Sequence, residues 1–238
     1  VSHQPVFIFA GMRLLGLVSP IISLMVFSGT IFTLLQFIHF LSLKKFSSNE
    51  VPKLKAVSCI QHLLWDGLLL IIFIIQHSLM KRLHLEKLMN YLGCQELSRS
   101  FYTLLTDLCL LLLIYQWKTC SSCLWNLDSK DYPLLFILIN ALHLCSWLTL
   151  YGSWLIQDFG ELTGLKQALY HDGDQSNIDS HKVKRQQGIL KHVRHTGLVP
   201  LTVICWVNGH MPLDRLLLGL FFPMYFLVVS HIDVYTAK

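Results

Sequence analysis

The sequence has 238 residues, of which 53% are hydrophobic and only 14% are charged. A soluble domain carries about 25% charged residues, so this composition excludes a disordered chain, a coiled coil and an ordinary soluble enzyme. Uncharged tracts, the longest of which covers residues 14–43, predict an all-α, polytopic bundle embedded in the lipid bilayer. The net charge of +5 is spread over the loops, which favours a membrane-topology signal over direct nucleic-acid binding.

The apolar tracts predict six membrane spans, because about 20 helical residues cross a hydrocarbon core of ~30 Å. In chain order the spans lie near residues 20–40, 58–80, 101–117, 132–156, 195–211 and 215–231. Gly209 and Pro212 lie in the short link between the last two spans, which predicts a tight helical hairpin. Asp66 and Asp107 lie in or near spans and are interpreted as hydrogen-bonded packing or headgroup-level residues. The alternative is a proton or ligand site.

The longest predicted loop covers residues 157–194. Phe159, Leu162, Leu165 and Leu169 recur in it at helical spacing, which predicts an interfacial helix over residues 158–171. Lysine and arginine residues divide unequally between the two sides of a six-span chain. Twelve lie on the side of this loop and both termini, and seven lie on the other side. The positive-inside rule therefore places the loop in the cytosol or nucleoplasm.

The seven cysteines are an odd number and most lie in apolar runs, so they predict no disulfide framework. Cys120 and Cys123 form a C-x-x-C motif without a second pair at zinc spacing, which argues against a metal site. On the lumenal side, where the topology places them, they could instead form a local disulfide. His192 and His195 are three residues apart, but no acidic or cysteine partner is near, so no metal is predicted.

Three groups of segments together resemble the nurim family, which comprises multi-span proteins of the inner nuclear membrane. They are Trp-Asp-Gly-Leu-Leu-Leu at residues 65–70 with Gln-His-Ser-Leu-Met at 76–80, Asp-Phe-Gly-Glu-Leu-Thr-Gly-Leu-Lys-Gln at 158–167, and His-Val-Arg-His at 192–195 followed by Asp-Arg-Leu-Leu-Leu at 214–218. Their order and spacing match across residues 65–235, whereas the first span matches only by its hydrophobicity. The resemblance implies a multi-pass protein of the inner nuclear membrane with possible protein partners in the nuclear envelope.

The nurim family is itself similar to isoprenylcysteine carboxyl methyltransferases, in which an Arg-His-Pro motif helps to hold S-adenosylmethionine. The resemblance implies cofactor-binding candidates at Gly188, Arg194 and His195, and His77 could face them from the end of the second span. Thr196 stands where that family has proline. After the last span, the sole acidic residue is Asp233, although those enzymes complete the site with acidic residues there.

Two hypotheses follow from the sequence. The first is a non-catalytic integral protein of the inner nuclear membrane, with no catalytic residues, cofactor or metal. The alternative is an S-adenosylmethionine-dependent membrane methyltransferase that acts on a lipophilic thiol or carboxylate. The missing proline and acidic tail favour the first hypothesis, and the retained Arg-His pair favours the second.

The charge asymmetry predicts that protease added to sealed microsomes will cut the 157–194 loop, because both termini and that loop face the cytosol or nucleoplasm. Immunoblotting with tags at the two ends would identify the cut. Protection of this loop together with cleavage between residues 120 and 131 would invert the topology.

Overall fold

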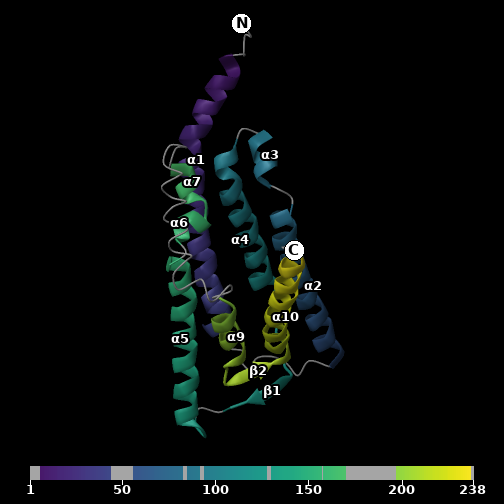
Figure 1. Ribbon diagram of the computed structural model, residues 1–238. Helices are drawn as coiled ribbons and strands as arrows, with labels where there is room; N and C mark the ends of the chain where they lie inside the picture. Colours follow the sequence, from purple (N-terminus) through teal and green to yellow (C-terminus); the bar gives the residue numbers. More distant parts are fainter. Residues whose placement is uncertain are drawn as a thin grey trace. The chain divides into compact units, whose positions relative to one another are not determined.

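The computed structural model describes residues 6–43, 56–82, 85–91, 94–127, 130–156, 158–169 and 197–236, and it is mostly helical (Figure 1). The chain divides into two compact units. Unit 1 comprises Val1–Phe37, Ile72–Leu112 and Ile156–Ile189, and unit 2 comprises Ile38–Ile71, Leu113–Leu155 and Leu190–Lys238.

Four long helices are apolar enough to cross a membrane within the described residues. They are α1 (Val6–Ile38), α2 (Ala56–Arg82), α4 (Ser98–Gln116) and α5 (Pro133–Ile156). The candidate spans in these regions are Val18–Ser42, Ser58–Met80, Gln95–Gln116 and Pro133–Leu155, so the prediction of a multi-pass helical membrane protein is confirmed. Two further helices, α9 (Leu198–Trp206) and α10 (Leu213–Thr236), cover parts of the regions of the last two predicted spans. Those two spans stay predictions.

Short elements connect the long helices. They are the π-helical turn η1 (His39–Leu43), α3 (Leu85–Tyr91), the 3-10 turn η2 (Gln95–Leu97), β1 (Cys123–Asn126), α6 (Phe159–Leu162), α7 (Leu165–Leu169) and β2 (His210–Pro212).

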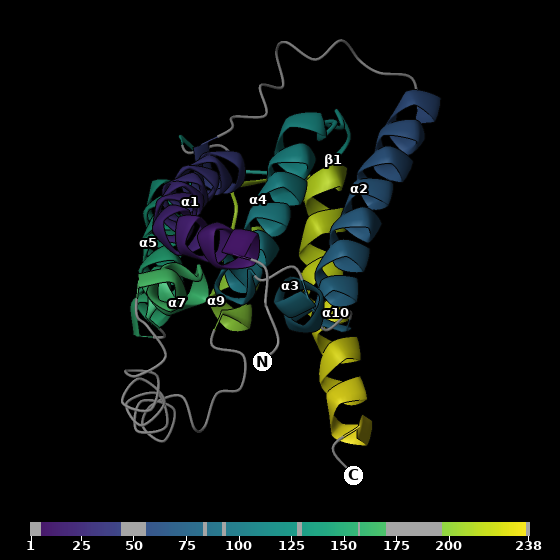
Figure 2. The same cartoon turned by 90° about the horizontal axis from the view of Figure 1, so that it is seen from above.

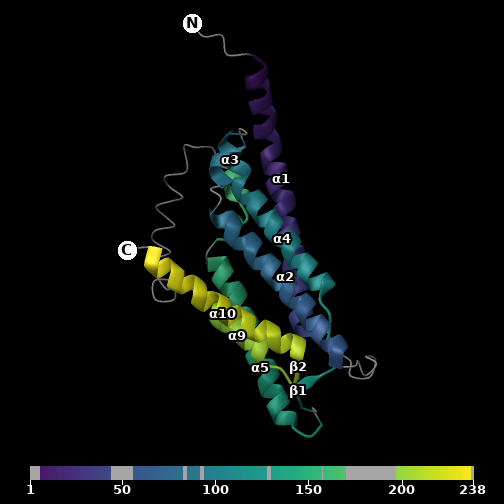
Figure 3. The same ribbon diagram turned by 90° about the vertical axis from the view of Figure 1, so that its right-hand side faces the viewer.

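In unit 1, α1 lies beside the segment that contains η2 and α4 and runs parallel to it (Figures 2 and 3). Three side-chain hydrogen bonds each join residues that are 77 positions apart: Ser19 to Glu96 at 3.0 Å, Ser23 to Ser100 at 2.9 Å and Thr30 to Asp107 at 2.6 Å. A constant difference in residue number means that both segments advance in the same direction. This is the orientation expected of the first and third spans in a chain that crosses a membrane back and forth.

The buried face of α1 explains how it approaches its neighbours. Buried residues recur at alternating spacings of four and three along this helix, namely Ser19, Ser23, Val26, Thr30, Thr33 and Phe37. Most of them are small or hydroxylated, which lets two membrane helices pack closely and bond across the contact. Large apolar side chains such as Ile21, Met25 and Leu35 are exposed, as expected of a surface that faces lipid.

In unit 2, the segment that follows α4, residues 116–120, is bound by side chains of α2. Asp66, which is fully buried, accepts a hydrogen bond from the Lys118 backbone N–H at 2.9 Å. Trp65 donates to the Gln116 carbonyl at 3.2 Å. The prediction that Asp66 and Asp107 are hydrogen-bonded packing residues is therefore confirmed, Asp107 by its bond from Thr30 in unit 1.

The second and third residues of α10 also hold elements of unit 2. Asp214 is fully buried and accepts from the Trp117 indole N–H and the Cys120 backbone N–H, both at 3.0 Å. Arg215 is 7% exposed and donates to Asn208 Oδ1 at 2.8 Å and to the carbonyl of Leu41 in η1. A guanidinium at the carbonyl end of a helix also complements the helix dipole.

A disulfide joins Cys59, in the first turns of α2, to Cys120 in unit 2, with the two Cα atoms 5.5 Å apart. Cys123 is a free, exposed thiol. The sequence predicted no disulfide framework and left a local Cys120–Cys123 bond open, whereas in the structure Cys120 is bonded to Cys59. The physical reason is tertiary: hydrogen bonds from α2 and α10 bring residue 120 within bridging distance of Cys59.

α9 and α10 form the predicted tight hairpin, since residues 207–212 alone link them and the Trp206 indole N–H donates to the Gly219 carbonyl at 3.0 Å. The sequence did not predict that the link contains a strand. Residues 210–212 form β2, which pairs antiparallel with β1 in a two-stranded sheet (Figures 1 and 3). The register pairs Cys123 with Pro212, and Asn126 with His210. Backbone polar groups of a buried link need partners, and the residues after α4 supply them through this sheet. The fold is therefore mostly α, with one small sheet added.

Candidate functional site

Most of the predicted cofactor-binding residues lie outside the described residues. Gly188, Arg194 and His195 belong, as do His192 and Thr196, to residues 170–196, which are outside the described part of the chain. His77 is described, on α2 within unit 1.

His77 takes part in a contact between two helices of unit 1. The Tyr102 hydroxyl of α4 lies 2.8 Å from its Nδ1, and the Phe73 ring stacks on the imidazole with centroids 6.1 Å apart. This hydrogen bond joins α2 to α4 within unit 1. The adjacent Gln76 has both amide atoms buried, and neither has a hydrogen-bond partner within the described part of the chain. An unpaired buried amide costs free energy. The Gln76 amide could therefore donate to and accept from a polar group of a ligand.

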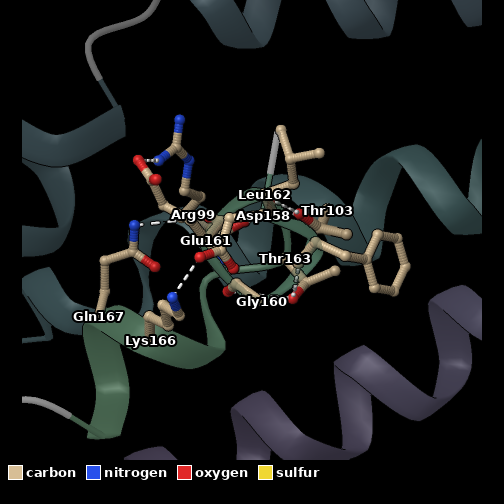
Figure 4. Close-up of polar contacts among 10 residues, drawn as sticks. Arg99, Thr103, Asp158, Gly160, Glu161, Leu162, Thr163, Lys166 and Gln167 are labelled. Carbon is tan, nitrogen blue, oxygen red and sulfur yellow. Dashed lines mark hydrogen bonds and ion pairs between the residues drawn. The ribbon is translucent and has the colours of Figure 1, made fainter. Parts of the chain in front are cut away.

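The clearest polar cluster in unit 1 is formed by α6 and α7 and the residues before α6, which we call the docked turn (residues 158–169; Figure 4). Asp158 begins it with a φ of 66°, an uncommon left-handed conformation for a residue other than glycine. Its carboxylate accepts from the Glu161 backbone N–H at 3.4 Å and forms an ion pair with Lys166. The local sequence therefore caps α6 and ties it to α7 with one acidic side chain.

Hydroxyl groups connect the docked turn to two long helices. Ser100 donates to the Thr163 carbonyl at 3.2 Å. Since a serine hydroxyl carries one proton, Ser23 is the donor in its 2.9 Å contact with Ser100. Ser23, Ser100 and Thr163 are all at most 1% exposed. A buried chain of hydrogen bonds thus runs from α1 through α4 to the turn.

Gly164 separates α6 from α7 and allows the turn to approach α4. Its φ is +84°, and a Cβ atom there would lie 2.6 Å from Ser100 Oγ and 2.7 Å from the Ser100 nitrogen. The continuous interfacial helix predicted over residues 158–171 is therefore wrong. Helical spacing of the leucines was correct within each short helix, but Gly164 breaks the helix, and residues 170 and 171 lie outside the described part.

The charges of the docked turn are paired within the protein. Arg99 Nη1 lies 3.5 Å from Glu161 Oε1, with the arginine side chain 43% exposed, and Thr103 donates to the Leu162 carbonyl at 3.4 Å. Figure 4 shows Arg99 and Lys166 directed at acidic residues of the turn. Among the described residues, no group of three or more histidine, cysteine, aspartate or glutamate side chains could hold a metal ion. The arrangement is suited to fixing the docked turn to α4.

The sequence identified the 158–167 string as distinctive but did not reveal its role. Ser23 and Ser100 were missed altogether, because single serines in apolar helices carry no distinctive pattern. The regular spacing of Ser19, Ser23, Thr30 and Thr33 is the signal that could have revealed the α1 contact.

Comparison with known proteins gives several similar chains. This chain is 36% identical over 170 residues to Nurim of Xenopus laevis, covering 70% of this chain and 59% of the relative. It is 35% identical over 162 residues to the Nurim homolog of Drosophila melanogaster, covering 68% and 64%. Nurim of Mus musculus is 34% identical over 180 residues, covering 74% and 68%. The matched part therefore spans less than two thirds of the first two relatives. No protein-family profile and no solved structure matches the chain.

Gly164→Ala is predicted to destabilise the protein by roughly 2 kcal/mol, because alanine disfavours a positive φ and its methyl group would collide with Ser100. Thermal unfolding of the detergent-purified protein would measure the loss. The matched control is Gly29→Ala in α1, where a Cβ meets nothing within 4 Å. Equal unfolding temperatures for the two variants would contradict the docking of the turn on α4.

Proposed function

The chain belongs to the nurim family, and on that premise we propose that it is a non-catalytic, multi-pass integral protein of the inner nuclear membrane. Its membrane-spanning helices and its family membership support this function. Its partners would be the bilayer and other proteins of the nuclear envelope.

The main support for a non-catalytic role is that the charged side chains of the docked turn are paired with one another or with α4. Asp158 pairs with Lys166, and Glu161 pairs with Arg99. Catalytic acids and bases must be free to exchange protons with a substrate, whereas these groups bind one another and cap a helix. Their arrangement supports a structural role for the most distinctive string of the sequence.

One observation favours the methyltransferase as a second candidate. The buried Gln76 amide has no partner within the described residues and lies beside His77, one of the residues suggested for the cofactor. A polar group of S-adenosylmethionine could satisfy that amide. Against this, Thr196 replaces the proline that fixes the motif's backbone.

A tagged full-length chain is expected to stain the nuclear rim and to resist alkaline carbonate extraction, because a buried helix bundle leaves the membrane only when the bilayer is dissolved. Fluorescence microscopy and fractionation would measure both. Uniform endoplasmic-reticulum staining would count against the inner-membrane proposal. Release by carbonate would contradict the membrane assignment itself.

The purified protein is expected to bind S-adenosylmethionine weakly or not at all, and Arg194→Ala is expected to leave rim localisation intact. Isothermal titration in detergent, with Lys191→Ala as a charge-matched control, would test the binding. Micromolar affinity that Arg194→Ala or His195→Ala abolishes, while Lys191→Ala retains it, would overturn the non-catalytic proposal and support the methyltransferase.

A further inference from the structure

Three cysteines of unit 2 are related through Cys120, which is bonded to Cys59 and lies three residues before Cys123. Cys59 and Cys120 form the disulfide and are each 4% exposed, whereas Cys123 is an exposed free thiol. Cys120 therefore belongs to two possible pairs, one with Cys59 across 61 residues and one within the C-x-x-C motif.

Only two residues separate Cys120 from Cys123, and the chain bends at Ser121 between them. A C-x-x-C pair at this spacing can form a disulfide, as it does in thiol–disulfide oxidoreductases. Cys123 is also at the start of a register shift between β1 and β2. Such irregularities commonly redirect a side chain out of the regular alternation of a strand.

Hydrogen bonds from α2 and α10 hold the backbone around Cys120 independently of its disulfide. Its backbone N–H donates to Asp214 Oδ1 at 3.0 Å, and the Lys118 N–H donates to Asp66 at 2.9 Å. The Thr119 carbonyl lies 3.0 Å from His62 Nδ1. These hydrogen bonds come from α2 and α10 and need no covalent bond to Cys59. Segment 116–120 would therefore stay bound to both helices after the disulfide moved.

We propose that Cys59, Cys120 and Cys123 form a thiol–disulfide exchange site in which Cys120 alternates between two partners. The Cys123 thiolate attacks Cys120 Sγ, so that the Cys120–Cys123 bond forms as the Cys59–Cys120 bond breaks. Cys59 leaves as a thiolate and takes up the proton that Cys123 lost. One disulfide and one thiol are present before and after, so the step requires no external oxidant or reductant.

The exchange moves the free thiol from the loop between α4 and α5 to the start of α2. One state ties α2 covalently to residue 120, and the other leaves only hydrogen bonds between them. A thiol or disulfide reagent of the surrounding compartment that reacts at this site would change whether α2 is covalently bonded to residue 120.

The test uses full-length protein that is purified without reductant, incubated at pH 8 and then trapped in acid with a thiol reagent that reacts at low pH. Peptide mass mapping without reduction would identify the disulfides and the labelled thiols. Wild type is expected to contain both disulfides and a labelled fraction of Cys59. Cys123→Ser is expected to remove the Cys59 label, and Cys145→Ser, at an exposed cysteine of α5, is expected to match wild type.

A second variant tests the alternative bond directly. In Cys59→Ser, a mild disulfide-forming oxidant is expected to link Cys120 to Cys123, which the mass map reports as a loss of two hydrogens within one peptide. The proposal is overturned if the Cys120–Cys123 bond does not form in Cys59→Ser. It is also overturned if the labelled fraction of Cys59 is the same in Cys123→Ser as in wild type.

Discussion

Every carboxylate buried in an apolar helix needs donors from another element, and this constraint organises both units. Water is scarce in a bilayer, and an unpaired buried charge costs several kcal/mol. In unit 1, Asp107 receives the Thr30 hydroxyl. In unit 2, Asp66 and Asp214 receive backbone and indole N–H groups from residues 117–120. Each acid therefore fixes the position of the segment that supplies its donors, and the relative register of the elements follows.

The strings that mark the nurim family lie at these positions. Asp66 and the Asp214–Arg215 pair hold the segment after α4 and the end of η1. The 158–167 string caps α6 and binds α4 through Thr163 and Gly164. The residues on which the resemblance to the nurim family rests thus have packing roles within each unit, because each satisfies a specific buried partner that an apolar side chain could not.

Hydropathy was sufficient to predict the long helices and the acids as packing residues, since both depend on local composition. It could not predict three features that depend on tertiary contacts. Cys59 is 61 residues from its disulfide partner, β1 pairs with a strand more than 80 residues later, and the leucine spacing around Gly164 gave no sign of its positive φ. The cofactor candidates Gly188, Arg194 and His195 stay predictions because they lie outside the described residues.

The docked turn depends more on its neutral contacts than on its ion pairs. The Arg99–Glu161 pair has a largely exposed arginine, and such pairs contribute about 1 kcal/mol or less and weaken with salt. The hydrogen bonds from Ser23 to Ser100 and from Ser100 to Thr163 are buried, and the Phe27 and Phe159 rings pack edge to face at 5.2 Å. Ionic strength hardly affects buried neutral contacts. The docked turn therefore stays attached to α1 and α4 when the salt concentration is raised.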